Sequence, residues 1–314
     1  MKTQYKSTVL VEAAKLYYEH QLSQLEISKK LKVSRPTVSR LLNQARNAGI
    51  VRIEIIDPSE VGTQLESALG RKFGLKKVVV VPNDTGDIKI IKKRLGKAAV
   101  LLVDQLVTEG TVLGISWGTT MQQVARQIRS RRVKNMVVVQ LNGGISRAEL
   151  DTHASEIANK IGESYKAIPY LMPLPAIVDN ANLKKAILSD KNISRTLELG
   201  RKAEIALFTI GSFGYNSVLV KADYFERDEV DELLKTGAVG DICSRIIKAD
   251  GTICSQELNN RTIGIELEEL KKKQYSIAVA GGKEKLTAIQ AGLKGKWFNS
   301  LIIDEWTATE LLRD

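Results

Sequence analysis

Hydrophobic residues between positions 23 and 45 recur at helical spacing in two short stretches. Ile27 and Leu31 lie four residues apart, which gives the first stretch one apolar face. The second stretch has an inner face formed by Val38, Leu41, Leu42 and Ala45. The segment 32–34 interrupts the repeat between them. The pattern predicts two short helices joined by a tight turn.

Capping residues support the same two helices. Ser23 followed by Glu26 matches a capping box, in which each side chain bonds the backbone N–H of the other residue. Ser34 is suited to cap the second helix, and its first turn tolerates Pro36 because that position needs no intrahelical N–H bond. Upstream, residues 8–20 have apolar positions at helical spacing and predict a bracing helix.

The outer face of the second helix is polar and basic. Seven Lys or Arg residues and no acid lie between Lys29 and Arg52, as expected of a surface that faces phosphate. Side chains of the types that contact phosphates and base edges predict a DNA-binding surface made of Lys29, Lys30, Ser34, Arg35, Thr37, Ser39, Arg40, Asn43, Gln44 and Arg46. We expect Arg40 and Asn43 to reach base edges, and Lys29, Lys30, Arg46 and Arg52 to neutralise phosphates. The alternative is a polar helical hairpin that only packs against another element.

A domain boundary follows this region. Residues 50–56 alternate between apolar and charged side chains, which predicts a strand, most simply one arm of a wing beside the two helices. Asp57-Pro58 ends the strand, because the residue before a proline is pushed out of the helical region. We therefore expect a DNA-binding domain over residues 1–57 and a second domain over residues 58–314.

The second domain alternates short apolar runs with helical patterns. The runs predict strands at 77–81, 111–116, 136–141, 205–210, 276–280 and 300–304, and the periodic segments predict helices at 60–73, 88–107, 121–129, 226–234, 284–292 and 306–312. Such alternation is typical of an α/β domain with a buried, mostly parallel sheet. Residues 240–258, with Asp250-Gly251 between two β-rich runs, predict an antiparallel hairpin added to that sheet.

Composition narrows the class of protein without identifying it. A chain of 314 residues with 43% hydrophobic and 26% charged residues has the balance of a soluble globular protein of about two domains. Ten basic and six acidic residues in positions 1–60 contribute +4 of the net charge of +11. Two cysteines and two histidines give little material for a zinc site, a disulfide framework or a histidine triad. Without a signal-peptide pattern or a membrane-length apolar run, we expect a cytoplasmic protein with no membrane partner and no metal.

Small and polar residues follow three of the predicted strands. Ser116, Gly118, Thr119 and Thr120 lead from strand 111–116 into a helix, whose free N–H groups and dipole suit a phosphate. Strand 136–141 runs into Asn142, Gly143 and Gly144, and strand 276–280 into Gly281 and Gly282, with Lys285 three residues on. Ligands bind at the carboxyl ends of parallel strands, so these loops predict a site for a small anion. Ordinary turn chemistry is the alternative for each Gly-Gly pair.

Two further polar stretches are candidate ligand contacts. Asp241 and Arg245 lie at the start of the predicted hairpin, and Asn260 and Arg261 follow it. Asp241 is suited to accept hydrogen bonds from sugar hydroxyls, and Arg261 to contact phosphate. An Asp–Arg surface pair and a polar turn are equally compatible with these residues.

Seven segments spread along nearly the whole chain resemble the bacterial sorbitol-operon regulator (SorC) family of transcription factors, especially its deoxyribonucleoside-regulator branch. They are EAAKLYYEHQLSQLEISKKLKVSRPTVSRLL (12–42), GISWGTTM (114–121), VVQLNGGIS (138–146), PLPAIVDNA (173–181), AVGDICSR (238–245), NNRTIGIEL (259–267) and AGGKEKL (280–286). The resemblance implies an N-terminal helix-turn-helix domain, winged on our interpretation, and a Rossmann-like effector domain similar to sugar-phosphate isomerases and deaminases. It also implies cytoplasmic homo-oligomers, dimers or tetramers, whose affinity for operator DNA is set by a phosphorylated sugar. The implied effector contacts match Thr119, Thr120, the residue before Gly143-Gly144, Asp241 and Lys285.

One position departs from the branch. Lysine is expected before the Gly-Gly pair, where its amine would form an imine with an open-chain sugar, but this chain has Asn142, whose amide cannot do so. We therefore expect a non-covalent effector, no other cofactor and no catalytic residue. The expected function is a regulator, a repressor of a carbohydrate or deoxyribonucleoside catabolic operon. The alternative is a sugar-phosphate isomerase or deaminase that carries a DNA-binding module.

Overall fold

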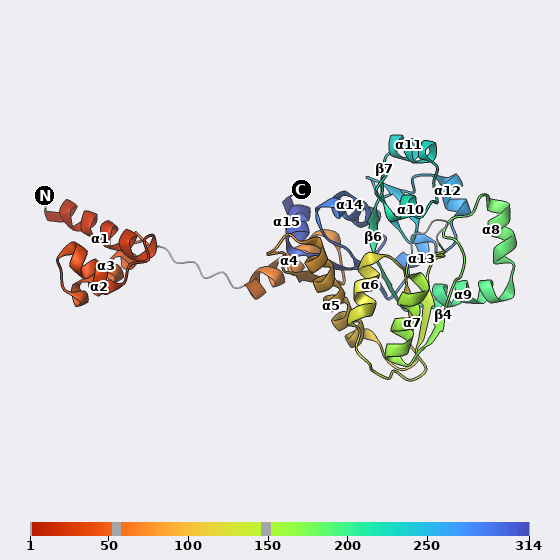
Figure 1. The fold of residues 1–314 in the computed structure, drawn as a ribbon, viewed down its shortest axis with the longest axis horizontal. Helices are drawn as coiled ribbons and strands as arrows, with labels where there is room; N and C mark the ends of the chain where they lie inside the picture. The colour runs from red at the N-terminus through yellow and green to blue at the C-terminus, as the bar shows by residue number, and fades with distance from the viewer. Residues whose placement is uncertain (1, 52–57, 146–151, 314) are drawn as a thin grey trace. The chain divides into compact units, whose positions relative to one another are not determined.

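The computed structural model describes residues 2–51, 58–145 and 152–313. The chain divides into two compact units, residues 1–57 and 58–314, and the division falls at the Asp57-Pro58 step that the sequence pointed to. Each unit is described by itself, and Figure 1 follows the chain from red to blue. The predicted wing strand over 50–56 lies outside the described residues from position 52 on.

The N-terminal unit contains three helices, α1 (Lys2–Tyr18), α2 (Gln24–Leu31) and α3 (Arg35–Asn47). Their buried core consists of Ala13, Leu16, Ile27, Val38 and Leu42. Both predicted caps are present. The Glu26 N–H donates to Ser23 Oγ over 3.3 Å while the Ser23 N–H donates to Glu26 Oε2 over 2.8 Å, and the Thr37 N–H donates to Ser34 Oγ over 3.3 Å. The two short helices and the turn between them are therefore confirmed.

A seven-stranded parallel sheet organises the second unit. Its strands are β1 (Lys77–Val81), β2 (Val112–Ile115), β3 (Val137–Gln140), β4 (Ile168–Tyr170), β5 (Ile205–Phe208), β9 (Tyr275–Val279) and β10 (Ser300–Asp304), in the order β1-β10-β9-β5-β2-β3-β4. From β2 the chain adds β3 and β4 on one side and then returns to add β5, β9 and β10 on the other. This is the doubly wound order of Rossmann-like folds, with β1 as an additional edge strand.

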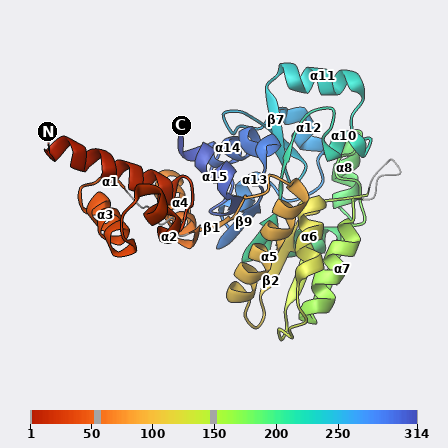
Figure 2. The same cartoon turned by 60° about the vertical axis from the view of Figure 1, so that its left-hand side comes forward.

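Helices cover both faces of the sheet. Their bounds are α4 (Pro58–Phe73), α5 (Ile88–Leu106), α6 (Thr119–Gln127), α7 (Ala154–Tyr165), α8 (Ala181–Leu188), α9 (Lys191–Lys202), α10 (Val218–Lys221), α11 (Arg227–Lys235), α12 (Gln256–Arg261), α13 (Leu267–Lys271), α14 (Leu286–Lys294) and α15 (Glu305–Arg313), with a 3₁₀ turn at Lys283–Lys285. Helices α5, α6 and α7 lie side by side on one face (Figure 2). The core of the other face includes side chains from α4, α13, α14 and α15.

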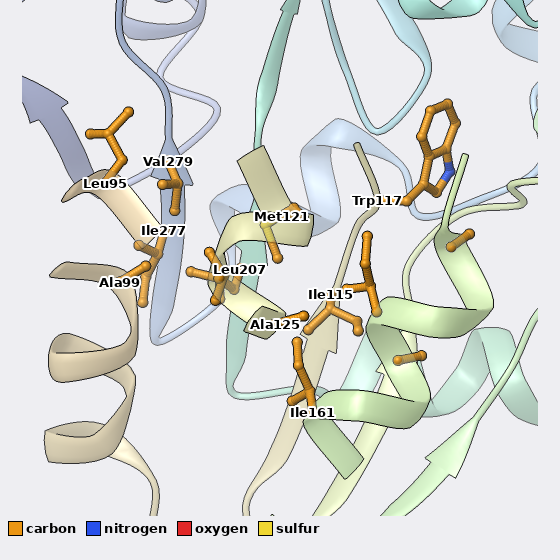
Figure 3. Close-up of a cluster of buried hydrophobic side chains, with 14 of the residues drawn as sticks. Leu95, Ala99, Ile115, Trp117, Met121, Ala125, Ile161, Leu207, Ile277 and Val279 are labelled. Atoms are coloured by element: carbon orange, nitrogen blue, oxygen red, sulfur yellow. The ribbon is translucent and has the colours of Figure 1, made fainter. Parts of the chain in front are cut away.

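Strand residues alternate between these two cores. Leu207 packs with the core under α5, α6 and α7, whereas its neighbours Ala206 and Phe208 belong to the core on the opposite face. Figure 3 shows Leu207 among apolar side chains from β2, β9, α5 and α6. A sheet buried on both faces explains why its strands read as continuous apolar runs in the sequence.

A second, antiparallel sheet of three strands contains β6 (Ile210–Ser212), β7 (Ala238–Ile242) and β8 (Arg245–Lys248). Two predictions are corrected here. The strand expected over 205–210 is split into β5 and β6, and the hairpin turns at Cys243-Ser244 rather than at Asp250-Gly251. Cys243 and Ser244 have φ values of 50° and 67°, the positive values of a tight hairpin turn. Asp-Gly is the stronger turn signal in a sequence, but here it forms the turn after β8.

The exposed edge of β1 is shielded by a helix. β1 pairs only with β10 in the described sheet, so its other side presents unpaired backbone groups. Glu66 of α4 accepts a hydrogen bond from the Val80 N–H over 2.9 Å, and Leu69 of the same helix is fully buried. Within the described ranges, no helix is both long enough and apolar enough to span a bilayer.

Candidate functional site

A cavity of about 190 Å³ opens at the carboxyl ends of β2 and β5. These are the neighbouring strands from which the chain extends the sheet in opposite directions, the place where doubly wound folds bind ligands. The cavity walls include seven of the predicted effector contacts: Ser116, Gly118, Thr119, Thr120, Asn142, Asp241 and Lys285. Segments far apart in the sequence therefore meet at one pocket. Its volume is below the 300 Å³ or more that is usual for drug-sized ligands, so it suits a small molecule.

The first wall of the pocket is the N-terminus of α6. Gly118 precedes the helix with a φ of 119°, a value that favours glycine, and no side chain caps its N–H groups. The first N–H groups of a helix have no intrahelical partner and carry a partial positive charge. Thr119 and Thr120, the first two helical residues, place their hydroxyls at the same wall. This end of the pocket is therefore suited to an anion.

Two lysines lie beside this helix end. Lys92 of α5 donates to Thr119 Oγ1 over 3.0 Å, and Lys285 donates to Thr209 Oγ1 over 3.1 Å. Burial, together with the positive charge of Lys92, lowers the pKa of Lys285 to about 8, although Asp241 opposes the shift. Burial also lowers the pKa of Lys92, against the opposing charge of Glu284. Neighbouring cations with lowered pKa values gain from a bound anion, which would favour their charged forms.

The opposite wall is built from hydrogen-bond acceptors. The Ser244 N–H donates to Asp241 Oδ2 over 3.2 Å, and Asn142 Nδ2 donates to Ser244 Oγ over 2.9 Å. Asn142 is 2% exposed, and its Oδ1 has no hydrogen-bond partner among the residues that the structure describes. Burial raises the pKa of Asp241 to about 6, and the Ser244 N–H and Lys285 limit the rise. A ligand with hydroxyl donors would satisfy these oxygens.

Two glycines make room for this wall. Gly211 of β6 pairs with Asp241 across the antiparallel sheet, and a Cβ at position 211 would overlap Asp241 Oδ1. Gly264 has a φ of 153°, and a Cβ there would lie 2.6 Å from the Cβ of Asn142. Both carboxylate and amide thus depend on missing side chains in neighbouring segments.

The glycine pairs do not line the pocket, contrary to the sequence-based expectation for Gly143, Gly144, Gly281 and Gly282. The Gly143 and Gly144 N–H groups donate to Ile263 O and Leu174 O over 3.1 and 2.9 Å. The Gly282 N–H donates to Asp304 Oδ2 over 2.7 Å. Their amides hold the loops in place and are not directed at the cavity.

Arg245, Asn260 and Arg261 also lie away from the cavity. Arg245 is 1% exposed and donates to Ile265 O over 2.7 Å and to Gly264 O over 3.0 Å, so it fixes the segment beside Asn142. Arg261 forms ion pairs with two glutamates, Glu229 and Glu257. Asn260 Oδ1 accepts a hydrogen bond from Gln256 Nε2 over 2.9 Å. For Arg261 the alternative of a surface ion pair fits the structure.

Other pocket residues were not anticipated from the sequence: Lys92, Thr209, Ser212, Asn216, Ser217 and Glu284. Lys92 belongs to an amphipathic helix, where a lysine is expected on the solvent side. The small polar residues of segment 209–217 follow β5, and reading that strand end in the same way as the other three would have found them.

The outer face of α3 has the exposure expected of a DNA-binding surface. Arg35, Arg40, Asn43, Gln44 and Arg46 are exposed, and Lys29 and Lys30 of α2 are exposed as well. Ser34 is exposed, while Thr37 and Ser39 are half-buried. The Ser34 and Thr37 hydroxyls lie 2.8 Å apart, so both take part in the helix cap.

Comparison with known proteins identifies the class. Residues 57–313 match the sequence model of the family described as "Putative sugar-binding domain". The chain belongs to this family, and over its whole length to the SorC family of transcriptional regulators.

Relatives of known name support the assignment over both units. The chain is 43% identical to the deoxyribonucleoside regulator of Bacillus subtilis, over 98% of each chain, and 31% identical to the sorbitol operon regulator of Klebsiella pneumoniae, over 97% of this chain and 98% of that one. The crystal structure of full-length SorC from Klebsiella pneumoniae superposes with a TM-score of 0.75 at 30% identity, covering 97% of this chain and 98% of that one. The predicted family and fold class are confirmed.

Proposed function

We propose that this regulator binds operator DNA through the outer face of α3, and that a small phosphorylated sugar in the pocket sets its affinity for that DNA. One observation carries the effector half of the proposal. A single cavity combines an uncapped helix N-terminus and two lysines with the carboxylate of Asp241 and the amide of Asn142. The first group suits a phosphate, and the second suits sugar hydroxyls.

The DNA half rests on the exposed basic face of α3. Arg40 and Asn43 are assigned to base edges, and the lysines of α2 with Arg46 to phosphates. We propose a homo-oligomer whose dimeric unit presents two copies of α3 to major grooves one helical turn apart. The names of the relatives, a deoxyribonucleoside regulator and a sorbitol operon regulator, support control of a catabolic operon by a cytoplasmic repressor.

The proposal gives the pocket a binding role without catalysis. Asn142 offers an amide where an imine-forming amine was expected, and it is tied to Ser244. Asp241 and Lys285 then serve to recognise the ligand, and its differential affinity for two states of the regulator appears as altered affinity for DNA.

A band-shift experiment tests both halves. The wild-type protein is mixed with the DNA upstream of its own gene at low salt, with and without a panel of pentose and hexose phosphates. We expect specific retardation that one class of sugar phosphate changes by at least about tenfold in DNA affinity, within the usual range of allosteric coupling. An absence of specific retardation at low salt would overturn the proposal.

Two lysine variants assign the response to the pocket. Lys285→Ala should retain DNA binding and lose the effector response, because it removes a cation from the phosphate end of the cavity. Lys283→Ala is the matched control, since Lys283 is an exposed neighbour that does not line the cavity. An equal loss in both variants would contradict the assignment.

A further inference from the structure

The pocket is polarised, with its cations at one end. Among the described residues that line it, the positively charged side chains are Lys92 and Lys285. Both are anchored by threonines, Lys92 through Thr119 at the start of α6 and Lys285 through Thr209 after β5. The helix N-terminus is at this end too, so every positive feature of the described lining serves one anion.

The acceptor end offers nothing positive to a second anion. Asp241 Oδ2 and the Ser244 N–H bond each other, and the unpartnered oxygen of this wall is Asn142 Oδ1. The nearest arginine in the sequence, Arg245, is buried and turned to the carbonyl groups of residues 264 and 265. A phosphate placed here would meet a carboxylate and lose its hydration without a counter-charge.

The charges of the lining add to the same conclusion. The two lysines are balanced by two acids, Asp241 and Glu284, of which Glu284 is exposed and close enough to Lys92 to oppose the fall in its pKa. One phosphate finds both lysines and the helix end. A second phosphate brings about two further negative charges into a lining whose positive groups are already used.

We infer that the pocket selects a polyhydroxy sugar with a single phosphate and excludes the corresponding bisphosphate. Asp241 and Asn142 are the residues that set this choice: they accept from hydroxyl groups at the end of the sugar remote from the phosphate. The inference rests on the proposed function and narrows the chemical class of its effector.

Calorimetric titration of the full-length protein with matched ligand pairs tests the inference. The pairs are fructose 6-phosphate with fructose 1,6-bisphosphate and ribulose 5-phosphate with ribulose 1,5-bisphosphate, and inorganic phosphate serves as the anion without hydroxyl groups. We expect the better monophosphate to bind at least about tenfold tighter than its bisphosphate. We also expect inorganic phosphate to bind weakly, and Lys285→Ala to abolish that binding.

The Asp241→Asn variant locates the selection. It removes the charge but keeps an oxygen that can accept from the Ser244 N–H, so the ratio of the two affinities should shrink by about fivefold or more. Asp228→Asn, at an exposed position of α11 outside the cavity lining, should leave the ratio unchanged. If Asp241→Asn does not fold, the wild-type ratio alone decides.

The outcomes separate the two proposals. A bisphosphate that binds the wild-type protein as tightly as its monophosphate, in a manner that depends on Lys285, would overturn the inference and leave the proposed function standing. An unchanged ratio in Asp241→Asn would remove Asp241 as its cause. If neither inorganic phosphate nor any ligand of the panel binds, both proposals fail.

Discussion

The two candidate binding surfaces of this chain are built in opposite ways. The DNA-binding face lies mostly on one 13-residue helix, α3, with exposed, hydrated side chains. The pocket gathers residues from position 92 to position 285, and burial shifts the pKa values of Asp241 and Lys285 away from their usual ranges. A surface that meets a large polyanion can stay fully solvated until contact. A site for a small anion must instead hold partly desolvated charges in place beforehand.

The largest expected effect separates the two regions by unfolding one of them. Leu42 is 2% exposed in the small core of the N-terminal unit, and Leu42→Ala should lower its free energy of unfolding by about 2–5 kcal/mol. That is a large share of the stability of a unit of this size. We expect DNA binding to be lost while sugar-phosphate binding is retained, as measured by band shift and calorimetry.

Leu41→Ala provides the control, because Leu41 is only half-buried on the same helix and should cost less. Loss of ligand binding in Leu42→Ala would show that the two units do not fold independently, and the comparison would then fail.

A smaller effect is expected from Arg40→Ala, which leaves the core intact. Removing a base-edge contact should cost about 1–3 kcal/mol of operator affinity and relax specificity at one base pair. Arg46→Ala should weaken binding to all sequences alike and reduce the dependence of affinity on salt. Band shifts with operator and random DNA at several salt concentrations measure both. Identical behaviour of the two variants would contradict the division between base and phosphate contacts.

The smallest effect is a pH dependence that belongs to the pocket alone. Lys285 has a pKa of about 8, and a bound anion favours its charged form, so binding takes up a proton. Effector affinity should therefore be highest below pH 8 and fall by about tenfold between pH 7 and pH 9.5, a range in which a phosphate monoester stays dianionic.

Lys285→Arg is the matched variant, since a guanidinium remains charged throughout this range. Its effector affinity should fall less steeply with pH, with only Lys92 left to titrate. A calorimetric pH series with the same slope in both proteins would show that Lys285 does not contact the anion.

The same contrast explains what the sequence could predict. Caps and apolar spacing specify α2 and α3 within a few neighbouring residues, and the doubly buried strands β1 and β10 read as continuous apolar runs. These features depend on local or repeated chemistry, and their predicted positions agree with the structure. The division of the pocket between cations and acceptors does not, because it depends on which strands lie side by side.

Particular residues show where the prediction stopped. Arg245 in a loop suggests a ligand contact, but it bonds the carbonyl groups of residues 264 and 265, which only the fold brings near. Lys92 suggests a solvated helix face, yet α5 packs against α6 and places its amine beside Thr119. Gly282 suggests an anion loop, but its N–H is bonded to the buried Asp304.

The protected edge of β1 has a consequence for handling the protein. Four consecutive valines, 78–81, form an apolar strand of the kind that pairs with other chains when its edge is bare. Lys76, Lys77 and Pro82 flank the run, and Glu66 of α4 occupies one of its outward N–H groups. A truncated sugar-binding unit that begins after α4 would lose that cover and expose a seed for aggregation. Preparations of the isolated unit should therefore begin at or before Pro58.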